Sequence, residues 1–171
     1  MVIWITGISG AGKTTLANHY KKRSKKKIIF FDGDEFRKLF NNDIQYSLKS
    51  RDINAQRLTK LVKFLSDQNN NIVISANITS YKYRLWCRKN ISNFVEIFID
   101  ADLKNLIKRD YKKLYSRALK RKMKNVVGVD IPFVKPSGSN IYLTNNQSKK
   151  AFLSQVKLID TYIKKNKIKI F

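Results

Sequence analysis

The sequence predicts a three-layer α/β fold in which a five-stranded parallel sheet carries helices on both faces. Short apolar segments recur along the chain, and stretches whose apolar residues have helical spacing separate them. Strands that alternate with helices are joined by crossovers, so neighbouring strands run parallel and both faces are covered. A length of 171 residues, 43% of them hydrophobic, suffices for one such domain over residues 1–171.

Five apolar runs are expected to form the strands. They lack the polar alternation of a half-exposed strand, which is typical of strands buried on both faces. The run at 2–6 is followed directly by glycine, and the others also lie between polar segments. The expected strands are 2–6, 28–31, 72–75, 94–99 and 140–143.

Helices are expected at 13–23, after the first strand, and wherever apolar residues recur every three or four positions. One such stretch is 50–68 and another is 148–164, which we expect to pack back on the sheet. The lysine-rich tail at 164–169 is expected to be peripheral. The apolar positions are Ile53, Leu58, Leu61, Val62 and Leu65 in the first stretch, and Ala151, Phe152, Val156, Ile159 and Ile163 in the second.

The stretch 104–124 differs, because its many lysines and arginines face a single acid, Asp110. A basic helix followed by a glycine-containing loop at 125–132, inserted before the last strand, is where a nucleotide kinase keeps a mobile lid. The sequence therefore predicts a lid at about 109–130. The alternative is a helix whose charged face is simply solvated.

Charge is the unusual feature of the composition. The 36 basic and 12 acidic residues give a net charge of +24. Such a surface indicates a polyanionic ligand or partner. The abundance of Lys, Asn and Ile has a second explanation, drift toward AT-rich codons, and the composition alone does not separate the two.

The chain offers little for disulfide or zinc chemistry. Cys87 has no second cysteine to pair with, and together with the single His19 it cannot form a four-ligand zinc site. No segment approaches the roughly 20 apolar residues that span a bilayer, and the run at 2–6 is too short for a secretion signal. We therefore expect a cytoplasmic protein that has no membrane partner.

The strongest motif is the phosphate loop Gly7-Ile-Ser-Gly-Ala-Gly-Lys-Thr14, which satisfies G-x-x-x-x-G-K-[ST] between a predicted strand and a predicted helix. Its glycines let the backbone wrap a phosphate chain, so that N–H groups and the helix N-terminus point at the anion. Lys13 is expected to reach the phosphates of ATP, and the Thr14 hydroxyl to ligate Mg²⁺. The expected ATP-binding residues here are Gly7, Ser9, Gly10, Ala11, Gly12, Lys13, Thr14 and Thr15.

Two carboxylates, in Asp32-Gly-Asp34, follow the second predicted strand. Ligands of open parallel sheets bind at this carboxyl end. We expect Asp32 to serve Mg²⁺ and Asp34 to accept the proton of an attacking hydroxyl, the usual role of a carboxylate in phosphoryl transfer. The catalytic candidates are therefore Asp34, Lys13 and Asp32. The alternative is an ordinary turn in which Asp34 caps a helix.

These motifs, in this order, resemble the adenylylsulfate kinase family over roughly residues 1–145. The resemblance implies a P-loop kinase that uses ATP and Mg²⁺ to phosphorylate the ribose 3′-hydroxyl of adenosine 5′-phosphosulfate. Asp32-Gly-Asp34 with Arg37 is similar to the family's Asp-Gly-Asp-Asn-x-Arg, with Glu35 in place of asparagine. By this resemblance Asp34 is the base, and Arg37 holds an anionic group of the acceptor.

Further segments resemble the family's acceptor site and lid. Tyr46-Ser47 and Arg51-Asp-Ile-Asn54 are similar to the segment that lines the family's acceptor site. Ile78-Thr79-Ser80-Tyr81 is similar to a loop that follows it. The stretch 109–115 is similar to the lid, and Lys112 corresponds to the lysine of that lid. Gly128-Val-Asp130 is similar to the end of the lid. The resemblance implies a homodimer, and it adds Arg109 to the ATP-binding residues. It also implies a set of acceptor-binding residues, which are Arg37, Tyr46, Arg51, Asn54, Ile78, Thr79, Lys112, Val126 and Gly128.

The departures from the family lie in the acceptor half. Val126 stands where the family has an aromatic residue that stacks on adenine, a loss of about 1–3 kcal/mol by analogy with base stacking. Ser80 replaces a proline and Lys113 a glycine. A pyrimidine needs less stacking area, and one branch of the family, cytidine diphosphoramidate kinase, acts on a cytidine nucleotide. Adenosine phosphosulfate and cytidine diphosphoramidate both remain open as acceptors.

A nucleic-acid-binding NTPase module is the alternative from another class. It would use the basic surface, and its affinity for nucleic acid would fall steeply with salt. Against it, lysine and arginine are spread over most expected helices, and no strand carries the aromatic residues that bind single strands. A small nucleotide acceptor explains the phosphate loop and the acceptor-like segments together, so we expect no nucleic-acid partner.

Overall fold

The computed structural model describes residues 1–40, 45–77, 80–110 and 112–171. Its centre is a five-stranded sheet in the order β2-β3-β1-β4-β5, and every neighbouring pair is parallel. The expected fold class is confirmed, and each strand begins within one residue of its predicted start. The strands are β1 (Val2–Thr6), β2 (Ile29–Asp32), β3 (Ile72–Ser75), β4 (Phe94–Asp100) and β5 (Ile141–Thr144).

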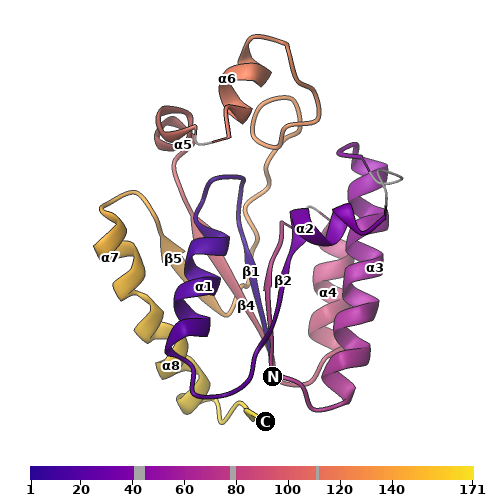
Figure 1. Cartoon of the computed structure of the whole chain (residues 1–171), viewed down its shortest axis with the longest axis vertical. Coiled ribbons are helices and arrows are strands. Elements are labelled where there is room, and N and C mark those ends of the chain that lie inside the picture. The colour runs from indigo at the N-terminus through magenta and orange to yellow at the C-terminus, as the bar shows by residue number, and fades with distance from the viewer. Residues whose placement is uncertain (41–44, 78–79, 111) are drawn as a thin grey trace.

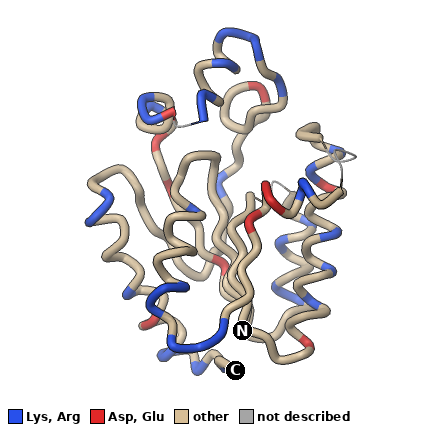
Figure 2. Tube along the Cα trace, in the orientation of Figure 1, with Lys and Arg blue, Asp and Glu red and all other residues tan. Residues whose placement is uncertain are grey.

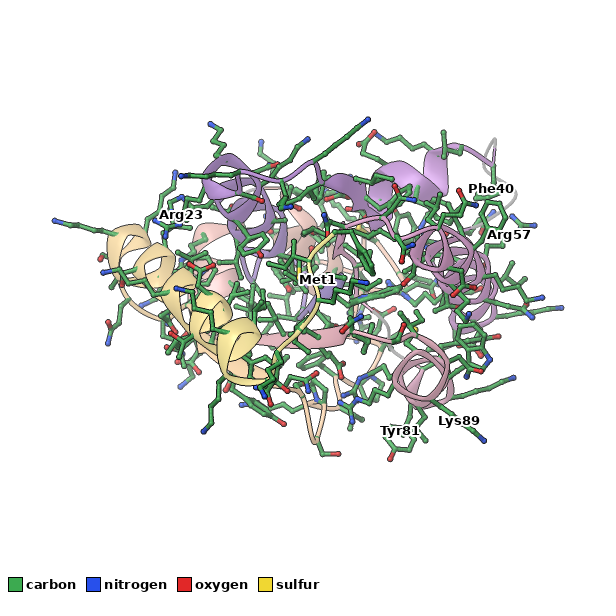
Figure 3. The ribbon with its side chains drawn as sticks, turned by 90° about the horizontal axis from the view of Figure 1, so that it is seen from below. Met1, Arg23, Phe40, Arg57, Tyr81 and Lys89 are labelled. Carbon is green, nitrogen blue, oxygen red and sulfur yellow. The ribbon has the colours of Figure 1, made fainter. Side chains whose placement is uncertain are left out.

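Helices cover both faces of the sheet (Figure 1). Helices α1, α7 and α8 lie on one face and α3 and α4 on the other, while α5 and α6 lie beyond the carboxyl ends of the strands. Met1 is buried between the two helical layers, as the view from below shows (Figure 3). The helices are α1 (Lys13–Arg23), α2 (Gly33–Lys38), α3 (Leu48–Asp67), α4 (Tyr81–Asn90), α5 (Leu103–Arg109), α6 (Leu114–Leu119), α7 (Lys149–Ser154) and α8 (Val156–Lys165).

Two apolar clusters hold these layers to the sheet. Alternate residues of β1 point into different clusters, with Ile3 and Ile5 against α1 and α8, and Val2 and Trp4 against α3 and α4. The indole of Trp4 is buried but satisfied, because Nε1 donates to the Ala76 carbonyl at 3.1 Å. Both faces of the central strand are therefore filled, which explains its uninterrupted apolar sequence.

One continuous basic helix at 104–124 was expected, and that prediction is wrong. Lys113, with a φ of 50°, precedes α6, so the chain breaks between α5 and α6. The Asp110 carboxylate accepts hydrogen bonds from the backbone N–H groups of Tyr115 and Ser116, both at 2.9 Å. The single acid of this basic stretch thus satisfies the free donors at the start of α6.

The C-terminal region also differs from expectation. The stretch 148–164 forms two helices, α7 and α8, that meet at Gln155, whose amide bonds both backbone groups of Thr144. The expectation that the tail at 164–169 is peripheral is wrong, because Ile168 packs against the main apolar cluster and the Lys169 N–H donates to Asn93 Oδ1 at 3.2 Å. The Phe171 N–H donates to Asn71 Oδ1 at 3.0 Å, and the Asn71 amide donates back to the Phe171 carbonyl.

Lysine and arginine occur on many elements, including the loop after α1, helix α3 and the region around α6 (Figure 2). This distribution matches the even spread of lysine and arginine along the sequence. In the described part of the chain, no helix combines the length and the apolar character that crossing a membrane requires.

Candidate active site

The phosphate loop links β1 to α1 at the carboxyl end of the sheet. Gly12 is the N-cap of α1 and has a φ of 100°, a conformation that favours glycine. A Cβ on Gly12 would lie 2.8 Å from Asn145 Nδ2 and 2.9 Å from the Phe152 ring. Asn145, directly after β5, is buried and donates from Nδ2 to the Ala11 carbonyl at 2.9 Å. The loop is therefore fixed from behind by β5 and α7.

Lys13 folds back over this loop. Its Nζ donates to the carbonyls of Gly7 at 2.9 Å and Ile8 at 3.0 Å. Burial lowers the pKa of Lys13 from 10.5 to about 8, and the nearby charges of Asp34 and Asp32 offset part of that decrease. An incoming phosphate would add negative charge beside a buried ammonium group, so we expect it to raise the pKa of Lys13 again.

Thr14, the second residue of α1, contacts Asp32, the last residue of β2. The Thr14 hydroxyl donates to Asp32 Oδ2 at 2.7 Å and lies 3.0 Å from the Ser75 hydroxyl. Asp32 Oδ1 accepts from the Asp34 N–H at 2.9 Å and caps α2. The helix cap expected for Asp34 in the alternative interpretation thus falls to Asp32, which leaves the Asp34 carboxylate available for another role.

The oxygen ligands of Thr14 and Asp32 fit a Mg²⁺ ion that arrives with a nucleotide. Mg²⁺ prefers oxygen and is usually held by one or two protein ligands together with phosphate oxygens and water. Among residues 1–40, 45–77, 80–110 and 112–171 there is no group of three His, Cys, Asp or Glu that could hold a metal by itself.

The Asp34 carboxylate faces the segment between α5 and α6. Lys112 Nζ donates to Asp34 Oδ2 at 2.9 Å, and both side chains are at least half exposed. Burial alone would raise the pKa of Asp34, but the hydrogen bond and charge of Lys112, with the charges of Lys13 and Arg37, outweigh it and lower that pKa. The same bond raises the pKa of Lys112. Asp34 is therefore held as a carboxylate.

Two arginines surround Tyr46, just before α3. The Arg37 guanidinium lies 4.6 Å from the centre of the Tyr46 ring and donates to the Gln45 carbonyl at 2.5 Å. The Arg51 guanidinium lies 5.6 Å from the same ring, and its Nε donates to the Tyr46 carbonyl at 2.9 Å. Cation–π contacts and backbone carbonyls thus hold both cations beside an exposed aromatic ring.

Arg51 also joins this region to the loop after α6. Its Nη2 donates to the Asn125 carbonyl at 2.8 Å. The Asp130 carboxylate closes that loop through the N–H groups of Asn125 and Val126. The Val126 side chain is only 3% exposed and belongs to the cluster that includes Tyr115. As the chain stands here, Val126 presents little surface to a ligand.

Gly128 brings the same loop against the phosphate loop. Its φ is 94°, and a Cβ at this position would lie 2.5 Å from Ile8 Cδ1. Tyr115 makes a second connection, because its hydroxyl donates to the Ser9 carbonyl at 2.7 Å. The segment expected to be a lid is therefore bound to the phosphate loop at two points.

Two polar atoms of the acceptor region are buried without a partner in the described part of the chain, Arg37 Nε and Asn54 Oδ1. Asn54 is only 7% exposed and lies one turn after Arg51 on α3. Buried polar atoms of folded proteins nearly always have a hydrogen-bond partner. One donor and one acceptor are thus free to bind a ligand.

The remaining expected residues are less closely connected. Gly10 and Thr15 are exposed at the loop and in the first turn of α1, and Arg109 is exposed at the end of α5. Ile78 and Thr79 lie outside the described residues, so their expected contact with the acceptor stays a prediction.

Sequence reasoning missed three residues of the site. Ser75 and Asn145 lie at or just after the carboxyl ends of β3 and β5, so the rule that placed Asp32 could have drawn attention to them. Tyr115 belongs to a segment that was recognised as part of a lid, but nothing in the sequence indicated its bond to the Ser9 carbonyl.

Comparison with known proteins agrees with this geometry. The family model for adenylylsulphate kinase matches residues 1–144. The cytidine diphosphoramidate kinase of Campylobacter jejuni is 35% identical over 161 residues, which cover 92% of this chain and 93% of that protein. A probable adenylyl-sulfate kinase of Pseudomonas aeruginosa is 36% identical over 151 residues, which cover 85% of this chain and 70% of that protein.

Among solved structures, the APS kinase CysC of Mycobacterium tuberculosis in complex with AMPPNP and APS superposes with a TM-score of 0.84. That comparison covers 95% of this chain and 96% of that one, at 27% identity. Shikimate kinase from Aquifex aeolicus, at 17% identity and a TM-score of 0.59, shares the fold. The chain, a phosphotransferase that acts on a hydroxyl acceptor, therefore belongs to the adenylylsulphate kinase family.

Proposed function

We propose that the protein transfers the γ-phosphoryl group of ATP to the ribose 3′-hydroxyl of a nucleotide bearing a second anionic group, and that cytidine diphosphoramidate is its preferred acceptor. The observation that carries the reaction is the convergence of Lys13, Asp34 and the Thr14–Asp32 pair at the carboxyl end of the sheet. These groups supply a cation for the phosphates, a carboxylate for the hydroxyl and oxygen ligands for Mg²⁺.

The chemical step needs a proton acceptor. The acceptor's 3′-oxygen forms a bond to the γ-phosphorus of ATP, the bond from that phosphorus to the β,γ-bridging oxygen breaks, and ADP leaves with the bonding electrons. Asp34 accepts the hydroxyl proton. Before Asp34 can accept this proton, Lys112 moves from Asp34 to the ligand phosphates. Breaking such a half-exposed ion pair costs about 1 kcal/mol or less.

The donor phosphates are bound by Lys13 and by the N–H groups at the start of α1. Lys13 exchanges the carbonyls of Gly7 and Ile8 for phosphate oxygens. Thr14 and Asp32 would hold Mg²⁺, which when bound neutralises phosphate charge. The protein thus contributes mainly positioning and charge stabilisation, as phosphoryl transfer requires.

Arg37 and Arg51 bind the acceptor's phosphate-like groups. Each now donates to backbone carbonyls that a charged ligand oxygen would replace with a stronger hydrogen bond. The buried Arg37 Nε can donate to an anionic oxygen, while Asn54 Oδ1 can accept from an N–H group of the ligand. A terminal group that carries both P–O⁻ and P–NH₂ offers a partner for each atom.

The base preference rests on Val126 and on the comparisons. Tyr46 offers one aromatic face beside Arg37 and Arg51, and the buried Val126 adds no second one. One stacking face suits a pyrimidine better than adenine. The match to the Campylobacter enzyme, which extends over 93% of that protein, supports the same acceptor. Adenosine phosphosulfate is the second candidate, supported by the family model and by the adenylyl-sulfate kinase relatives.

A direct assay tests the proposal. Purified protein with MgATP is given each acceptor separately, ADP release is followed, and the product is identified by ³¹P NMR. We expect a higher kcat/KM for cytidine diphosphoramidate than for adenosine phosphosulfate, and a kcat lower by about 10²–10⁴ in an Asp34→Asn variant that still binds ADP. Preference for the adenosine compound would reassign the acceptor. Phosphorylation of neither, with ATP hydrolysis stimulated by nucleic acid, would replace the kinase with the nucleic-acid-binding module.

A further inference from the structure

Ser75 stands beside the two residues expected to hold Mg²⁺. It is the last residue of β3 and the register partner of Asp32 on β2. Neighbouring residues of a parallel pair point to the same face, so both side chains reach the first turn of α1. Ser75 is only 3% exposed, and its Oγ lies 3.0 Å from Thr14 Oγ1.

Three hydrogen bonds connect Ser75, Thr14, Asp32 and the start of α2. Both oxygens of the Asp32 carboxylate accept, one from the Asp34 N–H and one from the Thr14 hydroxyl. Thr14 has a single hydroxyl proton, and the bond to Asp32 uses it. The remaining bond, between Ser75 and Thr14, therefore has Ser75 as its donor. The chain of bonds runs from Ser75 to Thr14 to Asp32.

This chain fixes the rotation of the Thr14 hydroxyl. One of its two lone pairs accepts from Ser75 and its proton points at Asp32, so the second lone pair has a defined direction. A hydroxyl that coordinates Mg²⁺ does so through a lone pair while its proton goes to an acceptor. Without the Ser75 donor, Thr14 could turn about its C–O bond and present a lone pair to Mg²⁺ only part of the time.

We propose that Ser75 is a positioning residue for the Mg²⁺ that accompanies the nucleotide, because it donates to Thr14 and so aims the Thr14 lone pair at the metal. Ser75 touches neither the phosphates nor the reacting atoms in this role. The inference rests on the proposed use of MgATP, but not on the identity of the acceptor. It predicts that Ser75 affects metal-dependent nucleotide binding and leaves metal-free binding alone.

The test compares ADP binding to the full chain with Mg²⁺ and with EDTA, by calorimetry, in Ser75→Ala and wild type. Mg²⁺ increases the affinity for ADP, and we expect this increase to be about five-fold smaller in Ser75→Ala than in wild type, which is the usual effect of losing one hydrogen bond. In EDTA, the affinities of the two proteins for ADP should agree within about two-fold. Mn²⁺ binding to the ADP complex, followed by electron paramagnetic resonance, should weaken by a similar factor. Ser75→Thr, which keeps the hydroxyl, should restore much of the gain.

Ser66→Ala is the matched control, because Ser66 is a buried serine near the C-terminal end of α3. It should change neither affinity. An unchanged Mg²⁺ gain in Ser75→Ala overturns the inference, and so does an equal loss with and without metal, which would indicate a purely structural role. Ser75→Cys is the second variant if Ser75→Ala unfolds. Since no acceptor is present, a wrong acceptor assignment leaves these results unaffected.

Discussion

Lys112 Nζ lies 2.9 Å from Asp34 Oδ2, although 78 residues separate the two in the sequence. The lysine comes from the segment between α5 and α6, and the aspartate from the first turn of α2. The residue expected to act as base is therefore paired with the residue expected to bind phosphates.

Replacing Lys112 with alanine should move the acid limb of the pH–rate profile to higher pH. Asp34 acts as a base when ionised, so activity falls as pH drops through its pKa. Lys112 lowers that pKa by a hydrogen bond and by charge, and its removal lets the pKa rise. The measurement is kcat/KM against pH, which reports the free enzyme. Lys120→Ala, an exposed lysine after α6, is the control, and an unmoved limb in Lys112→Ala would contradict the assignment of Asp34.

Asp34→Asn should lower kcat by about 10²–10⁴, the usual contribution of a general base, while ADP binding stays nearly unchanged. Asparagine keeps the shape of the side chain but cannot take up the hydroxyl proton. Single-turnover kinetics and ADP calorimetry separate the two effects. Glu35→Gln, next in sequence and paired only with the exposed Lys38 among the described residues, should leave kcat alone. Normal turnover in Asp34→Asn would remove it as base.

Nucleotide binding should take up a proton in alkaline solution. The pKa of Lys13 is about 8, so at pH 9 the side chain is mostly neutral, and bound phosphates raise its pKa. We expect about 0.9 proton per MgADP at pH 9, falling toward zero below pH 7. Calorimetry in buffers of different ionisation enthalpy measures it. The uptake should vanish in Lys13→Ala and persist in Lys22→Ala, which changes an exposed lysine of the same helix.

Val126→Phe should shift preference toward the adenine acceptor. A phenylalanine that turns out of the cluster adds a second stacking face, worth about 1–3 kcal/mol. One that stays inside overpacks a position that is 3% exposed, at a cost of about 1–3 kcal/mol. The ratio of kcat/KM for the two acceptors measures the first effect and thermal unfolding the second. An unchanged ratio in a variant of normal stability would discard the stacking argument.

Glu96→Gln should destabilise the fold by about 3 kcal/mol or more. Glu96 is 2% exposed and bonds both Arg84, at 2.5 Å, and Arg88, so its loss leaves a buried guanidinium without a counter-charge. Asp160→Asn is the control, because the Arg23–Asp160 pair is exposed and such pairs contribute less than about 1 kcal/mol. Urea unfolding compares them, and losses of equal size would contradict the role of burial.

The strands could be predicted because they are buried on both faces, which requires apolar residues throughout. Helix α4 could not. Arg84 is buried in it through the bond to Glu96, and Tyr83 and Cys87 alone give too short an apolar pattern. A buried arginine looks like an exposed one in sequence. The break between α5 and α6 was missed for a similar reason, since it depends on hydrogen bonds of Asp110 that no periodicity reveals.

For the site, the motifs predicted that Lys13, Thr14, Asp32 and Asp34 lie together at the carboxyl end of the sheet, and the structure places them there. They were not sufficient for groups that the sheet register or a long-range contact brings in, such as Ser75 beside Asp32 and Asn145 beneath Ala11. The partner of Lys112 was of this second kind. The acceptor identity, the homodimer and the cytoplasmic location stay predictions.

The hydrogen bonds that the cationic side chains of the site make within the chain also affect which anions can bind there. Lys13, Arg37, Arg51 and Lys112 each bond an oxygen of the chain itself, and together they use five carbonyls and one carboxylate. Inorganic phosphate or sulfate can replace only one or two of these bonds, so each such ion gains only a small part of the stronger hydrogen bonding that the four cations offer. A nucleotide with several linked anionic groups can replace many at once, so we expect this pairing to favour such a nucleotide over the small anions that any cell contains in excess.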